Sequence, residues 1–151
     1  DPPEEPAFSH VPSSEPLVVL FAAKVPHTRI ADHGWFGIRE GSDREEVPRW
    51  HRWEVWQNPG GPHDHVRHDL MSVDADVGAG GKRAVAVWRG EQAKRLGACI
   101  KTHSPSYPER HRYLIWPGPN SNTYITWMLD ACGVEHALPW TFYGAWYPLF
   151  E

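Results

Sequence analysis

The feature that most constrains the fold is a continuous apolar segment near the start of the chain. Residues 17–25 read LVVLFAAKV, a run rich in β-branched side chains that ends at Pro26. A short apolar run of this composition predicts a strand buried in the centre of a sheet. The 15 Pro and 13 Gly among 151 residues argue against a helical bundle, because both residue types interrupt helices. The chain is therefore expected to build its core around a sheet.

Two aromatic segments predict further strands. Residues 33–39 (HGWFGIR) alternate roughly, and residues 50–56 (WHRWEVW) place Trp50, Glu54 and Trp56 on one face of an extended segment. A Gly-Ser-Asp turn signal at 41–43 separates them, so we expect an antiparallel hairpin. Residues 84–88 (AVAVW) carry a weaker strand pattern, and the polar, Gly-rich stretch 58–81 is expected to be irregular.

Two segments have the spacing of helices. Residues 91–103 repeat apolar side chains at helical intervals, and residues 120–131 begin with Asn120 or Ser121 as the N-cap and stop before Gly133. Two helices packed on a mainly antiparallel sheet define an α+β fold, and the chain length suits one domain over residues 17–151. Residues 1–16 are acidic and Pro-rich and are expected to form an extended leader.

Composition excludes several classes of protein. A formal net charge of −4 argues against a nucleic-acid-binding protein, and no apolar run approaches the length of a membrane span. Two cysteines rule out a disulfide-dense scaffold and an all-Cys zinc site. Whether Cys99 and Cys132 pair or remain as two buried thiols stays open at this stage. No cofactor is expected.

The segment WPGPNSNTYITW at 116–127 carries the sharpest chemical signal. A Pro-Gly-Pro turn delivers Asn-Ser-Asn-Thr to the start of a predicted helix, where backbone amides lack partners and create positive potential. Such a position favours the anion of a nucleophile and can stabilise an oxyanion. Ser121 is the candidate nucleophile, and simple helix capping is the alternative role.

His33 and Glu54 complete a candidate catalytic group. His33 begins one aromatic strand and can act as a general base if Ser121 lies within reach. Glu54 stands among aromatic residues on the partner strand, where a carboxylate must be paired or carry a raised pKa. It can orient His33 or form an ion pair with a nearby Arg. The side chains expected to contact substrate or an oxyanion are Asn120, Asn122, Trp35, Trp116, Trp146 and Tyr147.

A rival site lies in the sequence PHDHVRHD at 62–69. Two His separated by one residue can bind a metal ion from an extended segment, and imidazole with carboxylate suits zinc. His63, His65 and His68 are the candidate ligands of this alternative metal-dependent enzyme.

Taken together, the motifs HGWFGIR, WEVW, WPGPNSNTY and LPWT resemble those of the uncharacterised bacterial family known as domain of unknown function 3750. The resemblance extends from about Leu17 to the C-terminus. It implies an envelope or secreted protein, because members commonly look membrane-anchored at the N-terminus. Membrane association through a missing N-terminal segment is therefore expected.

A more distant resemblance suggests an activity. Permuted papain-like hydrolases, including lecithin retinol acyltransferase-like and cell-wall amidase-like proteins, place a His on an early strand and an Asn-Cys-x-x-Phe motif at a later helix start. Asn120-Ser121-Asn122-Thr123-Tyr124 is similar, with Ser in place of Cys. The resemblance implies a permuted papain-like fold and a serine-dependent hydrolase or acyltransferase acting on ester or amide bonds. Expected substrates are small-molecule, lipid or cell-wall compounds. The other alternative is a non-catalytic envelope domain that binds a ligand in an aromatic cleft.

Overall fold

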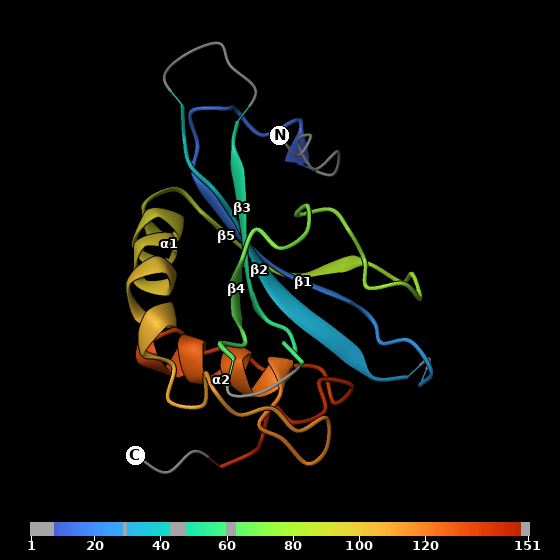
Figure 1. Cartoon of the computed structure of the whole chain (residues 1–151). Helices are drawn as coiled ribbons and strands as arrows, with labels where there is room; N and C mark the ends of the chain where they lie inside the picture. Colours follow the sequence, from blue (N-terminus) through green and yellow to red (C-terminus); the bar gives the residue numbers. More distant parts are fainter. Residues whose placement is uncertain (1–7, 29, 43–47, 60–62, 149–151) are drawn as a thin grey trace.

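The described part of the computed structural model, residues 8–28, 30–42, 48–59 and 63–148, contains a five-stranded antiparallel sheet with two α-helices on one face (Figure 1). The strand order is β4-β3-β2-β1-β5. The elements are β1 (Leu17–Lys24), β2 (Asp32–Arg39), β3 (Trp50–Val55), β4 (Val66–His68), β5 (Arg83–Arg89), α1 (Gly90–His103), the 3-10 turn η2 (Ser104–Ser106) and α2 (Ser121–Ala131). This arrangement confirms the predicted α+β fold.

Strand β1 is an interior strand between β2 and β5, and both of its faces are covered, which explains its continuous apolar sequence. Val18, Leu20 and Ala22 face the helices, whereas alternate residues such as Val19 and Phe21 belong to a second apolar cluster on the opposite face. All of these side chains are buried. A strand with both faces covered has no polar alternation, because neither face meets water.

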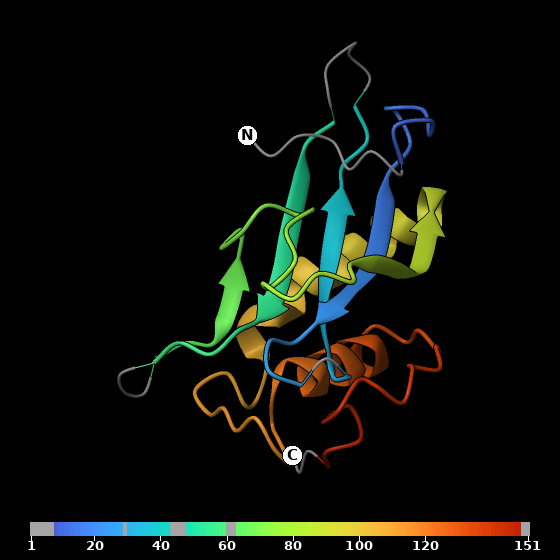
Figure 2. The ribbon, with the colours of Figure 1, turned by 90° about the vertical axis from the view of Figure 1, so that its right-hand side faces the viewer.

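The face opposite the helices is covered by irregular segments. Figure 2 shows the chain between β4 and β5 crossing in front of this face, with α1 behind the sheet and α2 near the lower ends of the strands. Phe8 and Val11 are also buried there. Arg39 donates to the carbonyl oxygens of Pro12 and Glu15 at 2.7 and 2.8 Å. Residues 8–16 therefore pack on the domain instead of forming a separate leader, and residues 1–7 lie outside the described residues.

The predicted hairpin of β2 and β3 is confirmed, with Phe36 opposite Trp53 and Arg39 opposite Trp50. The pairing covers only residues 36–39 of β2, so the backbone edge of residues 32–34 is not paired to β3. Strand β4 was not predicted, because three residues within a polar stretch are too short to reveal a period of two. The unpaired edge of β2 becomes important at the candidate site.

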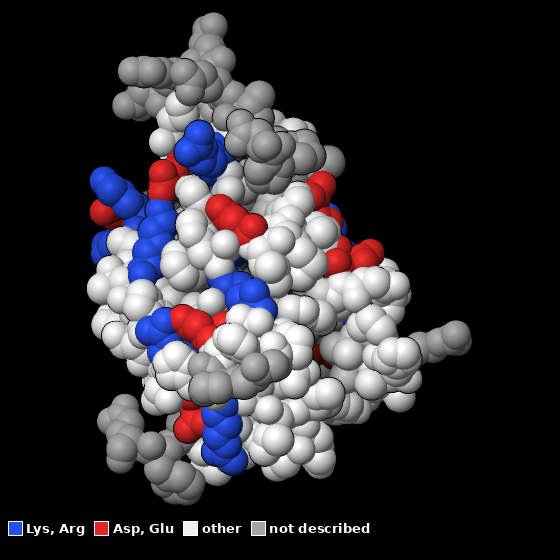
Figure 3. Space-filling view, in the orientation of Figure 1, with Lys and Arg blue, Asp and Glu red and all other residues white. Residues whose placement is uncertain are grey.

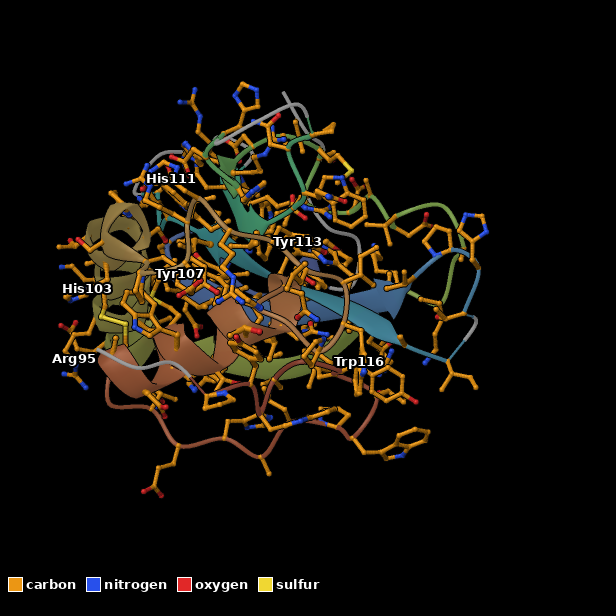
Figure 4. All side chains as sticks on the ribbon, turned by 60° about the horizontal axis from the view of Figure 1, so that its bottom comes forward. Arg95, His103, Tyr107, His111, Tyr113 and Trp116 are labelled. Carbon is orange, nitrogen blue, oxygen red and sulfur yellow. A yellow bond between two sulfur atoms is a disulfide. The ribbon has the colours of Figure 1, made fainter. Side chains whose placement is uncertain are left out.

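A disulfide between Cys99 and Cys132 joins α1 to the end of α2, which settles the pairing that the sequence left open (Figure 4). Within the described residues, no helix combines the length and apolarity that crossing a membrane requires. Basic and acidic side chains are interspersed on the face shown in Figure 3, where neither sign forms one continuous field.

Candidate active site

His33 is buried beside the second apolar cluster, on the sheet face opposite the helices, and contacts Glu54 on the neighbouring strand. Its Nε2 atom is 2.7 Å from Glu54 Oε1, and both side chains are almost completely buried. The imidazole ring stacks on Trp35 and meets Trp56 edge-on, with ring centroids 5.8 and 4.7 Å away. The hairpin register and two aromatic walls therefore hold the imidazole in one orientation.

Arg52 is the third member of this buried group, which we call the His–Glu–Arg network (His33, Glu54 and Arg52). Its Nε and Nη2 atoms donate to the two oxygens of Glu54 at 2.8 and 3.0 Å. Its Nη1 donates to the carbonyls of Ser72 and Ala75 at 2.8 and 2.6 Å. Glu54 thus contacts both partners that the sequence offered as alternatives. Sequence reasoning missed Arg52, although strand alternation places it on the face of Glu54.

The surroundings of Glu54 determine the protonation pattern of the network. Burial raises the pKa of the Glu54 carboxyl, but the hydrogen bond and the electrostatic attraction of His33, together with the charge and hydrogen bonds of Arg52, outweigh burial and lower the pKa below its ordinary value. An ionised carboxylate only accepts hydrogen bonds, so Nε2 of His33 carries the proton of their contact. In the neutral imidazole, Nδ1 then holds a lone pair, and this buried atom has no hydrogen-bond partner.

The start of α2 is closed by a capping box. Asn120 Oδ1 accepts from the amides of Asn122 and Thr123 at 3.0 and 3.4 Å, and Thr123 Oγ1 accepts from the Asn120 amide at 3.0 Å. Asn120 is therefore the N-cap and Ser121 is the first helical residue. The polar atoms of Asn120 that were expected to contact an oxyanion are engaged in capping and in a hydrogen bond to the Ile115 carbonyl.

Asn122 attaches the start of α2 to the unpaired edge of β2. Its Oδ1 accepts from the Gly34 amide at 3.1 Å, and its Nδ2 donates to the carbonyls of Asp32 and Tyr143 at 2.7 and 3.0 Å. The Asn122 side chain thus makes the backbone hydrogen bonds that a neighbouring strand would make, to the residues directly before and after His33. Asn122 is committed to positioning, and it brings the helix turn that carries Ser121 to the strand that carries His33.

Ser121 is buried, and its hydroxyl and amide face Tyr113. Burial raises the pKa of Tyr113, and hydrogen bonds from the hydroxyl and amide of Ser121 offset part of that rise. Because Nδ1 of His33 has no partner, the Ser121 hydroxyl is not hydrogen-bonded to it in this structure. Sequence reasoning missed Tyr113, which lies in a short apolar segment without a motif (Figure 4).

The aromatic residues expected to contact substrate fall into two groups. Trp35 is completely buried, and its Nε1 donates to the Val73 carbonyl, so it packs the core and lines no groove. Trp116 and Trp146 are about three-fifths exposed (61% and 59%), with ring centroids 5.7 Å apart. Trp146 lines two clefts of about 450 and 480 Å³ beside α2, and Tyr147 lines the larger one.

The predicted metal ligands of the 62–69 segment do not converge in the part of the chain that is described. His65 is buried, and its Nδ1 accepts a hydrogen bond from the Asn58 amide at 2.9 Å. His68 lies instead with His51 and Asp69. The spacing of the His residues did not reveal this, because His51 comes from a different strand.

The fold and site define a small α+β domain in which a buried His–Glu–Arg network lies against the capped start of a helix. Residues 15–147 match the family described as "Protein of unknown function (DUF3750)", and the chain therefore belongs to this family. Searches of the curated proteins and of the solved structures found no match.

Proposed function

We propose that the protein is a serine-dependent hydrolase or acyltransferase acting on ester or amide bonds, with Ser121 as nucleophile, His33 as general base and Glu54 as the group that orients His33. The observation that carries this proposal is the buried, unpartnered Nδ1 of His33. A buried polar atom without a partner costs free energy and calls for an explanation, and a role in catalysis supplies one for an imidazole nitrogen. Asn122 supports the assignment because it fixes the turn beside Ser121 to both neighbours of His33.

The proposed reaction requires the Ser121 hydroxyl to exchange its hydrogen bond to Tyr113 for one to Nδ1 of His33. The Ser121 oxygen forms a bond to the substrate carbonyl carbon, while its proton passes to Nδ1 of His33. Glu54 stabilises the resulting imidazolium through the 2.7 Å contact with Nε2. The imidazolium then protonates the leaving alcohol or amine as the carbonyl–heteroatom bond breaks, which produces an acyl-Ser121 ester.

The second half-reaction restores the enzyme. Water, or an acceptor alcohol or amine, loses a proton to His33 as it attacks the acyl ester, and His33 returns that proton to Ser121. The Tyr113 hydroxyl accepts from Ser121 in the resting state and retains its own proton, which suits donation to the oxyanion. The positive potential at the start of α2 favours the same charge.

Several features suit this assignment. The order of an early-strand His and a later helix-start nucleophile supports a permuted papain-like arrangement. The cleft of about 480 Å³ is lined by Trp146 and by Thr123, two residues after Ser121, and its aromatic wall suits an apolar acyl group or a peptide. The Cys99–Cys132 disulfide supports an envelope or secreted location, because structural disulfides persist in oxidising compartments.

The test is active-site labelling with a fluorophosphonate probe, followed by mass spectrometry of the modified peptide. We expect the wild-type chain to be labelled on Ser121 and Ser121→Ala to remain unlabelled. Glu54→Gln should reduce the labelling rate by up to about 10⁴-fold, as removal of the orienting carboxylate does in serine proteases. Ser106→Ala is the matched control, because Ser106 is exposed in η2 and outside the site.

A panel of p-nitrophenyl esters and peptide amides then compares the same variants and His33→Ala. Equal turnover by wild type, Ser121→Ala and His33→Ala would overturn the proposal. Absence of labelling and turnover in a correctly folded wild type would also overturn it, and would favour the non-catalytic domain that binds a ligand in the aromatic clefts.

A further inference from the structure

A second polar cluster lies at the outer edge of the sheet, separate from the proposed catalytic group. It comprises His51 on β3 and His68 and Asp69 at the end of β4, and we call it the His–His–Asp cluster. His51 Nδ1 lies 3.0 Å from His68 Nε2 and 3.2 Å from Asp69 Oδ2. The third side of the triangle, from His68 Nε2 to Asp69 Oδ2, is also 3.2 Å.

No placement of protons on the two imidazole nitrogens gives a favourable contact along all three sides of this triangle. If both ring nitrogens carry hydrogen, two N–H groups face each other across the 3.0 Å distance. If only one carries hydrogen, two lone pairs face each other across one of the 3.2 Å sides. A cation at the centre would accept all three lone pairs at once.

The dimensions fit the coordination face of a transition metal. An ion that lies at the usual Zn–N and Zn–O distances of about 2.0–2.1 Å from all three atoms would have ligand–metal–ligand angles of about 100°. That angle lies between octahedral and tetrahedral values. Two imidazoles and one carboxylate form a set that suits zinc and its neighbours in the first transition row.

The surrounding residues hold the ligands in place. The other carboxylate oxygen of Asp69, Oδ1, accepts from the Arg52 amide at 2.6 Å, and the Asp69 amide donates to the Arg52 carbonyl at 2.8 Å. The His68 ring stacks on Trp53 with centroids 4.4 Å apart and planes at 11°. Such outer contacts orient the ligands of natural metal sites.

We infer that His51, His68 and Asp69 form a binding site for one Zn²⁺ or similar divalent transition-metal ion. His68 and Asp69 are exposed, so the remaining coordination positions face solvent and can take water or a further ligand. The inference is independent of the proposed hydrolase, because none of its three ligands belongs to the Ser121–His33–Glu54 group.

The test is calorimetric titration of the full, chelator-stripped chain with Zn²⁺, together with a thermal-unfolding scan at each metal concentration. We expect one Zn²⁺ per chain and a higher Tm when zinc is present. His68→Ala and Asp69→Asn should each weaken binding at least about 10-fold, the lower bound measured for outer residues of metal sites. Asp69→Asn retains an oxygen for the Arg52 amide, so it changes the ligand while the local structure is kept.

His136→Ala is the matched control, because His136 is an exposed histidine outside the cluster. It should bind zinc as the wild type does, and circular dichroism without zinc should be the same for all variants. Equal affinity of wild type, His68→Ala and Asp69→Asn would overturn the inference. Binding by the wild type only at millimolar zinc, or its loss in His63→Ala but not in His51→Ala, would overturn it as well.

Discussion

Replacing Arg52 with Met is expected to lower the free energy of unfolding by about 3–5 kcal/mol at neutral pH, the cost of leaving one partner of a buried ion pair unpaired. Arg52 and Glu54 have no exposed side-chain surface and share two hydrogen bonds. The guanidinium also lies 4.0 Å above the Trp35 ring and donates to two carbonyls of the covering segment. A Met side chain retains the volume and loses all of these polar contacts.

The loss of unfolding free energy caused by Arg52→Met should be larger at neutral pH than at acidic pH. In the wild type, folding lowers the pKa of Glu54. The ionised carboxylate therefore stabilises the fold at pH values above the ordinary pKa of 4.5, and this stabilisation is lost as the pH falls through the lowered pKa. Without the charge and hydrogen bonds of Arg52, the pKa of Glu54 is higher in the folded variant than in the folded wild type, so the variant takes up the carboxyl proton at a higher pH. The difference in stability between the two proteins should therefore be smaller at about pH 4.5 than at about pH 7.

Urea denaturation followed by circular dichroism at both pH values measures this prediction. Arg95→Met is the matched control, because Arg95 is exposed on α1 and its replacement should change stability by less than about 0.5 kcal/mol. The double variant Arg52→Met/Glu54→Gln should recover part of the loss, since it removes the unpaired charge. An Arg52→Met deficit that is equal at the two pH values would contradict this account of Glu54.

The elements that the sequence predicted have a strong local signal. β1 is a continuous apolar run, the β2–β3 hairpin and both helices have recognisable hydrophobic patterns, and all of them form where expected. The N-cap of α2 was also identifiable, because Asn is among the best capping residues. These features are local, so the chain itself contains the information.

The parts of the site that escaped prediction depend on contacts between distant segments. Asn122 holds the edge of β2 only because the pairing of β2 with β3 ends at Phe36 and Trp53, before it reaches residues 32–34. Tyr113 meets Ser121 through a loop without periodicity. Trp35 was expected in a groove, but residues 8–16 and the segment after β4 cover its face of the sheet. Irregular covering segments carry no pattern that reveals which face they bury.

The second large effect is expected from removing the disulfide. Cys99 and Cys132 are 33 residues apart, and closing a loop of that length in the unfolded chain corresponds to about 4 kcal/mol in the chain-entropy account. The variant Cys99→Ser/Cys132→Ser should lose about that free energy of unfolding. For a domain of this size, the loss corresponds to a Tm lower by about 8–15 °C.

The fold itself should survive this change, because the helices also share apolar contacts with one core. Leu96, Ile100, Ile125 and Met128 belong to the same buried cluster on the helix side of the sheet. The double variant should therefore unfold in a single transition, with a far-ultraviolet circular dichroism spectrum like that of the wild type. Cys99→Ala/Cys132→Ala should behave like the Ser variant. Reduction of the wild-type disulfide should lower the free energy of unfolding and the Tm by the same amounts, because each change removes the same covalent constraint. A double variant within about 1 kcal/mol of the oxidised wild type would show that core packing alone fixes the two helices.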